Sequence, residues 1–186
     1  MVRIIAGEHR GRKLLGPASD ATRPITDRIK QRIFDRLDAA GWISGAEVLD
    51  VFAGTGSFGL EALSRGATHV SFFERDRSAI ERLRKNIAAV DGVTRCTVVD
   101  GDVFAHFMQR RLPRPADLVF FDPPYPMVTG EAERLRRLLD ALAPQLAPDG
   151  EIHFRHDVRD TPTLGTLPVV GTKAYGSMAV TYIGKP

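Results

Sequence analysis

The spacing of apolar residues changes near residue 47. From there on, short apolar runs alternate with longer stretches of helical periodicity, which is typical of consecutive βαβ units and predicts a largely parallel sheet. Two final apolar runs, 167–175 and 178–183, flank Gly176-Ser177 and predict a closing antiparallel hairpin. We expect the other strands at 47–53, 69–74, 95–100, 117–122 and 150–155, and helices at about 57–65, 76–90, 102–111 and 130–145.

The first 41 residues predict a small β-hairpin followed by one helix. A turn bounded by Gly7 and Gly11 separates two short apolar runs, which is a hairpin signal. Thr26 is placed to cap the helix, because apolar residues recur behind it at helical spacing. The expected ranges are 2–6 and 12–15 for the hairpin and 27–40 for the helix. We therefore expect an N-terminal extension, residues 1–41, followed by a second domain, residues 42–186.

Composition narrows the class of protein. The chain has 186 residues, of which 43% are hydrophobic and 26% charged, as in a globular protein and unlike a disordered one. Apolar runs are too short for a membrane span, and the N-terminus lacks the pattern of a secretory signal, so we expect a cytoplasmic location without membrane contact. Cys96 is the only cysteine, and His153 and His156 have no third ligand nearby. We therefore expect no internal disulfide and no metal site.

Positive charge is concentrated at the N-terminus. Residues 1–41 carry nine Lys and Arg against five Asp and Glu, a net charge of +4, whereas the whole chain is +3, so the remaining residues sum to −1. Such asymmetry is expected of an arm that binds a polyanion. A solvated face without a partner gives the same pattern, and charge alone leaves both readings open.

A glycine-rich turn follows the first predicted strand of the second part. Gly54, Gly56 and Gly59 have the G-x-G-x-x-G spacing, and Glu74 ends the next strand, 20 residues after Gly54. This spacing fits a dinucleotide or S-adenosylmethionine (AdoMet), since both present a ribose to the acidic residue. Asp50 favours AdoMet, because a carboxylate there repels a pyrophosphate and attracts an ammonium or sulfonium group. A turn that merely packs a helix on a strand remains the alternative.

A second motif, Asp122-Pro123-Pro124-Tyr125, follows the buried run 117–121, at a strand end of the kind where α/β proteins bind ligands. Two prolines remove two backbone donors and stiffen the turn, so we expect carbonyls free to accept hydrogen bonds. Asp122 and the Pro123 carbonyl can accept both hydrogens of a nucleobase amine and aim its lone pair at a methyl donor. Tyr125 offers a face for stacking the base. A rigid loop without chemistry is the alternative.

Other residues between the two motifs have candidate supporting roles. Glu74 is the ribose candidate, while Asp76 is better suited to cap the next helix. Asp102 ends the third strand, where it can accept from an adenine amine, cap the following helix, or do both. Phe104 and Phe107 are expected in the core rather than against a base.

At this point the chain resembles the bacterial 16S ribosomal RNA guanine-N2 methyltransferases, the small-subunit rRNA methyltransferase D type. The resemblance covers essentially the whole chain; the glycine and Asp-Pro-Pro-Tyr motifs are common to many amino methyltransferases, and the two N-terminal segments are specific to the family. The chain departs from the family at Gln31 and at 153–156, where a more acidic sequence is usual. The residues that carry the resemblance are Arg3-Ile4-Ile5-Ala6-Gly7 with Arg10-Gly11-Arg12-Lys13, Arg23-Pro24-Ile25-Thr26-Asp27-Arg28, Asp50 to Gly56 with Gly59 to Gly66, and Asp122 to Tyr125.

The resemblance implies a Rossmann-like class I AdoMet-dependent methyltransferase fold, α/β, with a mostly parallel seven-stranded sheet and a C-terminal antiparallel hairpin. It implies AdoMet as methyl donor, S-adenosyl-L-homocysteine as product, and guanine N2 of 16S rRNA in the small subunit or its assembly intermediate as acceptor. We expect the protein to be a monomer. The positions implied are Asp122, Pro123, Pro124 and Tyr125 for catalysis, Asp50, Phe52, Ala53, Gly54, Gly56, Glu74, Arg75, Asp102 and Val103 for the cofactor, and Arg10, Arg12, Lys13 and Arg28 for RNA.

Three other functions stay open. An amino methyltransferase acting on another nucleic acid, such as adenine N6 in DNA or RNA, would use the same Asp-Pro-Pro-Tyr turn, although 186 residues leave little room for a domain that reads a DNA sequence. An NAD-dependent oxidoreductase is disfavoured by Asp50 and by the lack of a second, substrate-binding domain. A non-catalytic RNA-binding protein that has kept the fold is disfavoured by the intact Asp-Pro-Pro-Tyr motif.

Overall fold

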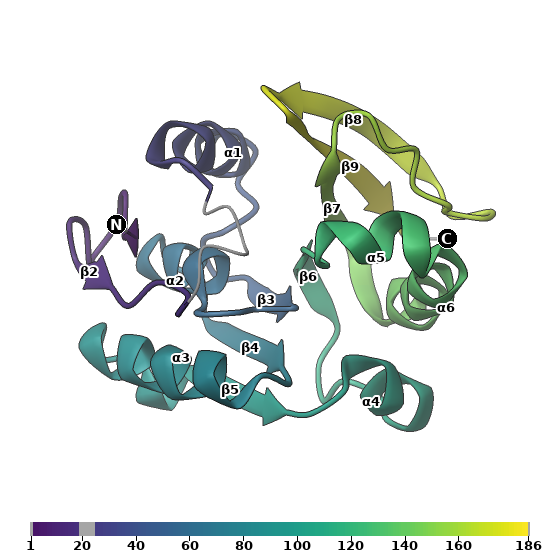
Figure 1. The fold of residues 1–186 in the computed structure, drawn as a ribbon. Helices are drawn as coiled ribbons and strands as arrows, with labels where there is room; N and C mark the ends of the chain where they lie inside the picture. Colours follow the sequence, from purple (N-terminus) through teal and green to yellow (C-terminus); the bar gives the residue numbers. More distant parts are fainter. Residues whose placement is uncertain (1, 19–24, 186) are drawn as a thin grey trace.

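A computed structural model describes residues 2–18 and 25–185, in which one seven-stranded sheet forms the middle layer (Figure 1). The strand order is β5-β4-β3-β6-β7-β9-β8. The first five strands in this order are parallel, and β9 runs antiparallel to both β7 and β8, which confirms the predicted α/β class. The strands are β3 (Glu47–Val51), β4 (His69–Glu74), β5 (Cys96–Asp100), β6 (Ala116–Phe121), β7 (Leu146–Asp157), β8 (Val169–Tyr175) and β9 (Met178–Gly184).

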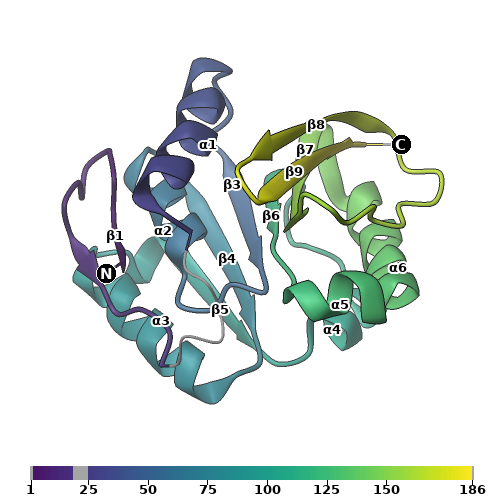
Figure 2. The ribbon, with the colours of Figure 1, turned by 45° about the horizontal axis from the view of Figure 1, so that its top comes forward.

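Helices cover both faces of the sheet (Figures 1 and 2). Alternate residues of each central strand face opposite layers, so that Leu118 and Phe120 join one hydrophobic cluster and Val119 and Phe121 the other. The first cluster lies under α1 (Asp27–Ala39), α2 (Ser57–Ser64) and α3 (Arg77–Ala89). The second lies under α4 (Val103–Gln109), α5 (Tyr125–Gly130) and α6 (Ala132–Leu142). Two 3₁₀ turns, η1 (Val93–Arg95) and η2 (Ala143–Gln145), lead into β5 and β7.

Side-chain caps begin three of the helices at the predicted places. Thr26 Oγ1 accepts a hydrogen bond from Ile29 N at 3.4 Å, and Asp76 Oδ1 accepts from Ala79 N at 2.8 Å. Asp102 caps α4, where its Oδ1 accepts from Phe104 N at 3.0 Å. Each cap satisfies an amide that has no partner within its helix. The predicted capping roles of Thr26, Asp76 and Asp102 are confirmed.

Several boundaries differ from the prediction, and α5 lies where no helix was expected. The helix expected at 130–145 begins only at Ala132 and is divided into α6 and η2, because Glu131, with a φ of −128° and a ψ of 32°, leaves the helical conformation before α6 and Pro144 lies in the final turn. β7 begins at Leu146 rather than 150 and accommodates Pro148 and Gly150 through a register shift against β6. The first strand of the sheet ends at Val51 rather than 53, because Phe52 adopts a left-handed φ of 64°.

The N-terminal hairpin is joined to α2 by buried polar contacts. It consists of β1 (Val2–Arg3) and β2 (Lys13–Leu14), much shorter than the runs 2–6 and 12–15 expected. The fully buried Glu61 accepts from Ile5 N at 2.8 Å and Ala6 N at 3.0 Å, and its Oε2 lies 3.2 Å from Lys30 Nζ. A Cβ on Gly7 would lie 1.9 Å from the Ser64 carbonyl oxygen, so only glycine allows this approach.

The hairpin and α1 share a core with the sheet. Ile4, Leu14 and Phe34 belong to the same buried cluster as Phe72 and Phe120. The division into 1–41 and 42–186 stays a prediction, and the predicted Arg23-Pro24 segment lies outside the described residues. In the part of the chain that is described, no helix has both the length and the apolar character needed to cross a bilayer.

Candidate active site

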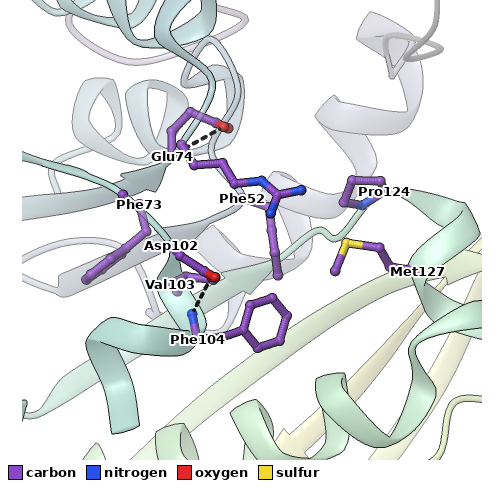
Figure 3. Close-up of a pocket in the computed structure, with 10 residues that line it drawn as sticks. Phe52, Phe73, Glu74, Asp102, Val103, Phe104, Pro124 and Met127 are labelled. Carbon is purple, nitrogen blue, oxygen red and sulfur yellow. Dashed lines mark hydrogen bonds between the residues drawn. The ribbon is translucent and has the colours of Figure 1, made fainter. Parts of the chain in front are cut away.

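The order of the strands creates a crevice beside β3. The chain runs outward from β3 to β4 and β5, then returns to place β6 on the other side of β3. Ligands of open α/β sheets bind outside the carboxyl ends of strands at such a point. A pocket lies there (Figure 3), and it is lined by Phe52, Phe73, Glu74, Arg75, Gly101, Asp102, Val103, Phe104, Pro124 and Met127.

The glycine turn after β3 is held by backbone contacts and by Glu74. Phe52 has a φ of 64°, which is rare for a bulky residue and typical of functional sites. Ala53 N donates to the Phe73 carbonyl at 3.0 Å, and Gly54 N donates to Glu74 Oε2 at 2.7 Å. Gly54 has a φ of 56°, and a Cβ built on it would meet no atom within 4 Å. The turn therefore leaves open space above Gly54.

The second and third glycines of the motif serve packing. A Cβ on Gly56 would lie 2.4 Å from Leu83 Cδ1, and one on Gly59 would lie 2.4 Å from Phe72 Cε1. These two positions let α2 approach the sheet and α3 closely. The interpretation of the glycines as a means to pack a helix on a strand therefore holds for Gly56 and Gly59, while Gly54 faces open space. The assignment of Gly56 to the cofactor stays a prediction.

Two acidic residues stand on the pocket wall with part of their hydrogen-bonding capacity already used. Glu74 Oε1 accepts from Arg75 N at 2.8 Å and Asp76 N at 2.9 Å. Asp102 accepts the capping bond with one oxygen, and its Oδ2 lies 3.1 Å from Arg134 Nη2. A carboxylate has about four acceptor positions, so Glu74 retains one and Asp102 two for a ligand. Their roles on ribose and adenine stay predictions.

Apolar side chains form the rest of the wall. Phe52, Phe104 and Met127 lie around the same hollow (Figure 3), and the ring centroids of Phe52 and Phe104 are 6.0 Å apart. The prediction that Phe104 belongs to the core holds in part, since its partly buried ring packs against the second cluster. The ring also lines the pocket under the guanidinium of Arg134, whose Cζ is 3.8 Å from the ring centroid. Phe107 is buried in the core, as predicted.

Asp50 lies beneath the turn. Its side chain is buried within β3, and its Oδ2 accepts from Gly59 N in the first turn of α2 at 2.9 Å. Burial raises the pKa of Asp50 well above the usual value for an aspartate. Burial disfavours the charged form of Asp50, and this works against the charge-based argument for AdoMet over NAD. The contact of Asp50 with a cofactor stays a prediction.

The Asp-Pro-Pro-Tyr motif forms a corner between β6 and α5. Asp122 N donates to the Val51 carbonyl at 3.3 Å, Pro123 is buried, and Pro124 reaches the pocket wall. Tyr125 begins α5 and is 37% exposed. The expectation of free carbonyls was wrong for Pro124, whose oxygen accepts from Met127 N at 2.8 Å as the short helix turns. The corner thus joins the pocket to an exposed aromatic ring.

Sequence reasoning missed the partner of Asp122. Arg155 Nε donates to Asp122 Oδ1 at 2.6 Å, and Arg155 Nη2 lies 2.6 Å from Asp122 Oδ2. The two residues follow paired positions, because Phe121 of β6 is opposite Phe154 of β7. A signal existed in the sequence, since the predicted strands 117–122 and 150–155 end with these two residues and parallel strands end at the same edge. To use this signal, one has to know that the two strands are neighbours in the sheet.

The predicted RNA-binding residues are not among those that line the pocket. Arg10, Arg12, Lys13 and Arg28 are exposed. The hairpin tip lies at the end of α2, where Glu8 N donates to the Ser64 carbonyl at 2.7 Å. That end lies beside the start of β3, as the bond from Gly45 N to the Gly66 carbonyl at 2.9 Å shows. The structure therefore places the tip toward the amino edge of the sheet, opposite the Asp122 corner, and its RNA contact stays a prediction.

The sheet order and the pocket beside β3 define a Rossmann-like fold of the class I methyltransferase type. A solved structure from Escherichia coli, described as "Putative methyltransferase yhhF", is 32% identical and superposes with a TM-score of 0.81 over 99% of this chain and 98% of its own. A family model described as conserved hypothetical protein 95 matches residues 2–184, and the chain belongs to this family.

Two curated relatives carry more specific names. "Putative rRNA methyltransferase YlbH" of Bacillus subtilis is 33% identical over 96% of both chains. "Ribosomal RNA small subunit methyltransferase D" of Escherichia coli is 41% identical over 67% of this chain, and the match spans 60% of that relative. The family resemblance inferred from the sequence motifs is confirmed.

Proposed function

We propose that the chain is an AdoMet-dependent methyltransferase that methylates the exocyclic N2 amine of a guanine in 16S rRNA. One observation carries the proposal: the Asp122 corner and the pocket are a single structure, because Pro124 belongs to both. The names of the relatives support ribosomal RNA as the substrate class. The substrate we propose is the small ribosomal subunit or its assembly intermediate, which the basic N-terminal extension would contact.

The pocket has the chemistry that AdoMet requires. Glu74 offers a carboxylate suited to a ribose diol, Asp102 offers one suited to an exocyclic amine, and Phe52, Phe104 and Met127 provide apolar walls for a flat ring. The glycine turn leaves open space at Gly54 for the methionine part. When bound, AdoMet supplies an electrophilic methyl group on a sulfonium centre. A structure with S-adenosylhomocysteine (SAH) has been solved for a protein of similar fold, "SMU.776, a putative methyltransferase complexed with SAH", with a TM-score of 0.64 and 17% identity.

The corner residues would prepare the acceptor amine. The lone pair of a nucleobase amine is delocalised into the ring, which makes the nitrogen a weak nucleophile. Asp122 and the Pro123 carbonyl can accept its two hydrogens, which favours a pyramidal nitrogen with its lone pair directed away from the ring plane. Bound AdoMet would supply the methyl group to this nitrogen, and its sulfur would keep the electron pair of the broken carbon–sulfur bond. The nitrogen becomes cationic and releases a proton to water or Asp122, so no strong base is needed.

The test uses small ribosomal subunits from a strain that lacks the corresponding methyltransferase. The purified chain is incubated with these subunits and AdoMet carrying a labelled methyl group, and the labelled nucleotide is mapped by mass spectrometry. We expect one N2-methylguanine in 16S rRNA. Label on adenine N6, or on DNA added in parallel, would refute the guanine assignment. Calorimetric titration with AdoMet and with NADH tests the cofactor, and binding of NADH alone would refute it.

A further inference from the structure

The contact between Arg155 and Asp122 has a geometry that fixes one carboxylate plane. Two parallel contacts of 2.6 Å join Nε and Nη2 of the guanidinium to the two different oxygens of Asp122. Such bidentate pairs constrain the orientation of both planar groups, in addition to their attraction. The side chains retain 17% and 20% exposure, so both are largely screened from solvent. A single contact would leave the carboxylate of Asp122 free to rotate, whereas the two contacts with Arg155 fix its plane.

The surroundings of Arg155 keep the guanidinium in place. It extends from β7 toward two aromatic rings, with its Cζ 5.8 Å from the centroids of both Phe58 in α2 and Tyr125 in α5. Burial acts to lower the pKa of Arg155, but the charge and hydrogen bonds of Asp122 outweigh it and raise the pKa, so the side chain stays cationic. The guanidinium is therefore held from three sides, by a carboxylate and by two rings.

We propose that Arg155 is the positioning residue of the methyl transfer, which holds the carboxylate of Asp122 in the orientation that receives the target amine. This inference rests on the proposed function. Arg155 occupies one acceptor position on each oxygen of Asp122, and a carboxylate has about four, so one position on each oxygen remains for the amine hydrogens. Arg155 itself exchanges no proton and makes no bond to the substrate. Its effect passes through Asp122 alone.

The dependence on Asp122 separates this role from a structural ion pair. If the ion pair only joined β6 to β7, breaking it would lower the stability of the protein and leave the turnover of each folded molecule unchanged. A positioning pair would change turnover, and the change would disappear once Asp122 is absent, because residues that act as a unit are not additive. A lysine has the charge but lacks the planar fork, so it separates charge from orientation.

The experiment compares Arg155→Met, Arg155→Lys, Asp122→Ala and the double variant Arg155→Met/Asp122→Ala with the wild type. Arg159→Met is the matched control, because Arg159 makes a similar two-contact pair with Asp157, at 2.8 and 2.9 Å, near the end of the same strand. For each protein, turnover on the undermethylated small subunits is measured at saturating AdoMet. The AdoMet dissociation constant and the thermal midpoint are measured alongside.

We expect Arg155→Met to lower kcat by about 10-fold or more and to leave the AdoMet dissociation constant within about 2-fold. Arg155→Lys should recover only part of the loss, and Arg159→Met should match the wild type. In the Asp122→Ala background, Arg155→Met should change kcat by less than about 2-fold. Wild-type kcat in Arg155→Met, or losses that multiply in the double variant, would overturn the inference.

Failure of the proposed function would look different. A wild-type protein that methylates no RNA would refute the function itself. An Asp122→Ala variant with full turnover would leave the function standing and would overturn the positioning role, because Arg155 acts through Asp122. The orientation of the Asp122 side chain in crystals of Arg155→Met is a second readout, which does not depend on turnover. We expect the carboxylate plane to rotate away from the orientation seen with Arg155. An Asp122 side chain that keeps its orientation in those crystals would overturn the positioning role, whatever the substrate is.

Discussion

Asp50 and Asp122 lie on neighbouring strands close to the same sheet edge, in opposite electrostatic surroundings. Asp50 is buried and, among the described residues, accepts a hydrogen bond from the Gly59 amide alone. Burial raises its pKa. Asp122 faces the guanidinium of Arg155 at 2.6 Å. An unpaired buried carboxyl suits a structural role in holding α2, and a paired, partly exposed one suits contact with a substrate amine. The two residues can therefore be tested separately.

For Asp122, we expect Asp122→Ala to slow methyl transfer by at least ~10²-fold, because an acceptor aimed at the developing charge is lost. The AdoMet dissociation constant should remain nearly unchanged, since Asp122 is not among the residues that line the pocket. Single-turnover kinetics and calorimetric titration measure the two quantities. Equal losses in binding and in rate would contradict the catalytic assignment.

For Asp50, we expect Asp50→Asn to change how stability depends on pH. A carboxyl with a raised pKa binds its proton more tightly in the folded state, so it stabilises the fold below its unfolded pKa, near 4, and this stability is lost as pH rises toward the folded pKa. The loss amounts to about 1.4 kcal/mol for each tenfold difference in proton affinity.

Asparagine keeps an oxygen that accepts from Gly59 N, and it does not titrate. The loss of stability with rising pH that Asp50 causes should therefore be absent in this variant. Urea unfolding of both proteins from pH 4 to 8 measures the difference between their unfolding free energies. Other titrating groups, such as the buried His153, are shared and cancel in the comparison. Parallel pH profiles would show that Asp50 does not carry this effect.

At the residue scale, local motifs were predictable and partners across strands were not. The acidic residues and the Asp122 corner could be found because each follows a strand within a few positions. Arg155 pairs with Asp122 across 33 positions of sequence, and only the order of the strands brings them together. Phe104 is an apolar residue near the start of its helix, and only the structure shows that its ring lines the pocket as well as packing against the core.

At the scale of elements, strong periodicity was reliable and tertiary packing decided the rest. The helix after Thr26 and the parallel strands agree with the prediction to within a few residues. The helix α5 was missed because Pro126 and Gly130 are poor helix formers, yet it forms because Met127 and Val128 are buried against the sheet. The start of β7 was missed because Pro148 and Gly150 are unusual inside a strand.

The docking of the hairpin on α2 gives a prediction with a matched control. Gly7 and Gly11 have nearly equal φ values, 83° and 84°, but a Cβ on Gly7 would strike the Ser64 carbonyl and one on Gly11 would meet no atom within 4 Å. Alanine at either position costs about 1–2 kcal/mol for the left-handed backbone. Gly7→Ala should cost about 1–3 kcal/mol more, because overpacking adds to it.

Urea unfolding of Gly7→Ala and Gly11→Ala measures the two costs. Similar unfolding free energies in the two variants would mean that the hairpin shifts away from α2 without a loss of stability. In that case, the contacts of Glu61 with Ile5 and Ala6 would contribute little to the position of the hairpin. A larger cost at Gly7 would show that the tip and α2 are fixed to each other.

At the scale of the whole molecule, charge and chemistry are separated in space. The exposed Arg10 and Arg12 of the hairpin tip lie at the far end of α2 from the glycine turn, while the paired residues Asp122 and Arg155 lie at the carboxyl edge. The fold class and the seven-stranded sheet were predictable, because they follow from alternating strands and helices and from the family resemblance. The position of the hairpin was not, since it depends on buried contacts with Glu61 and Ser64.

For the hairpin, we expect Arg10→Ala/Arg12→Ala/Lys13→Ala to weaken RNA binding and to flatten its dependence on salt. Each lost phosphate contact should reduce the slope of log K against log salt by about 0.7–0.9. The control changes three exposed cations elsewhere, Arg137, Arg159 and Lys173, to alanine, with the same loss of charge. Binding to 16S rRNA at several salt concentrations gives the slopes. Equal slopes for both triple variants would leave the hairpin without a special role.

The helix between the turn and the hairpin tip sets a minimum size for the acceptor. The eight residues of α2 span about 12 Å at 1.5 Å per residue. A mononucleotide carrying the acceptor base is shorter than this span, whereas a folded RNA domain is long enough to touch both the Asp122 corner and the tip. A mononucleotide should therefore be methylated slowly at low concentration, and substitution of the tip cations should not change that rate.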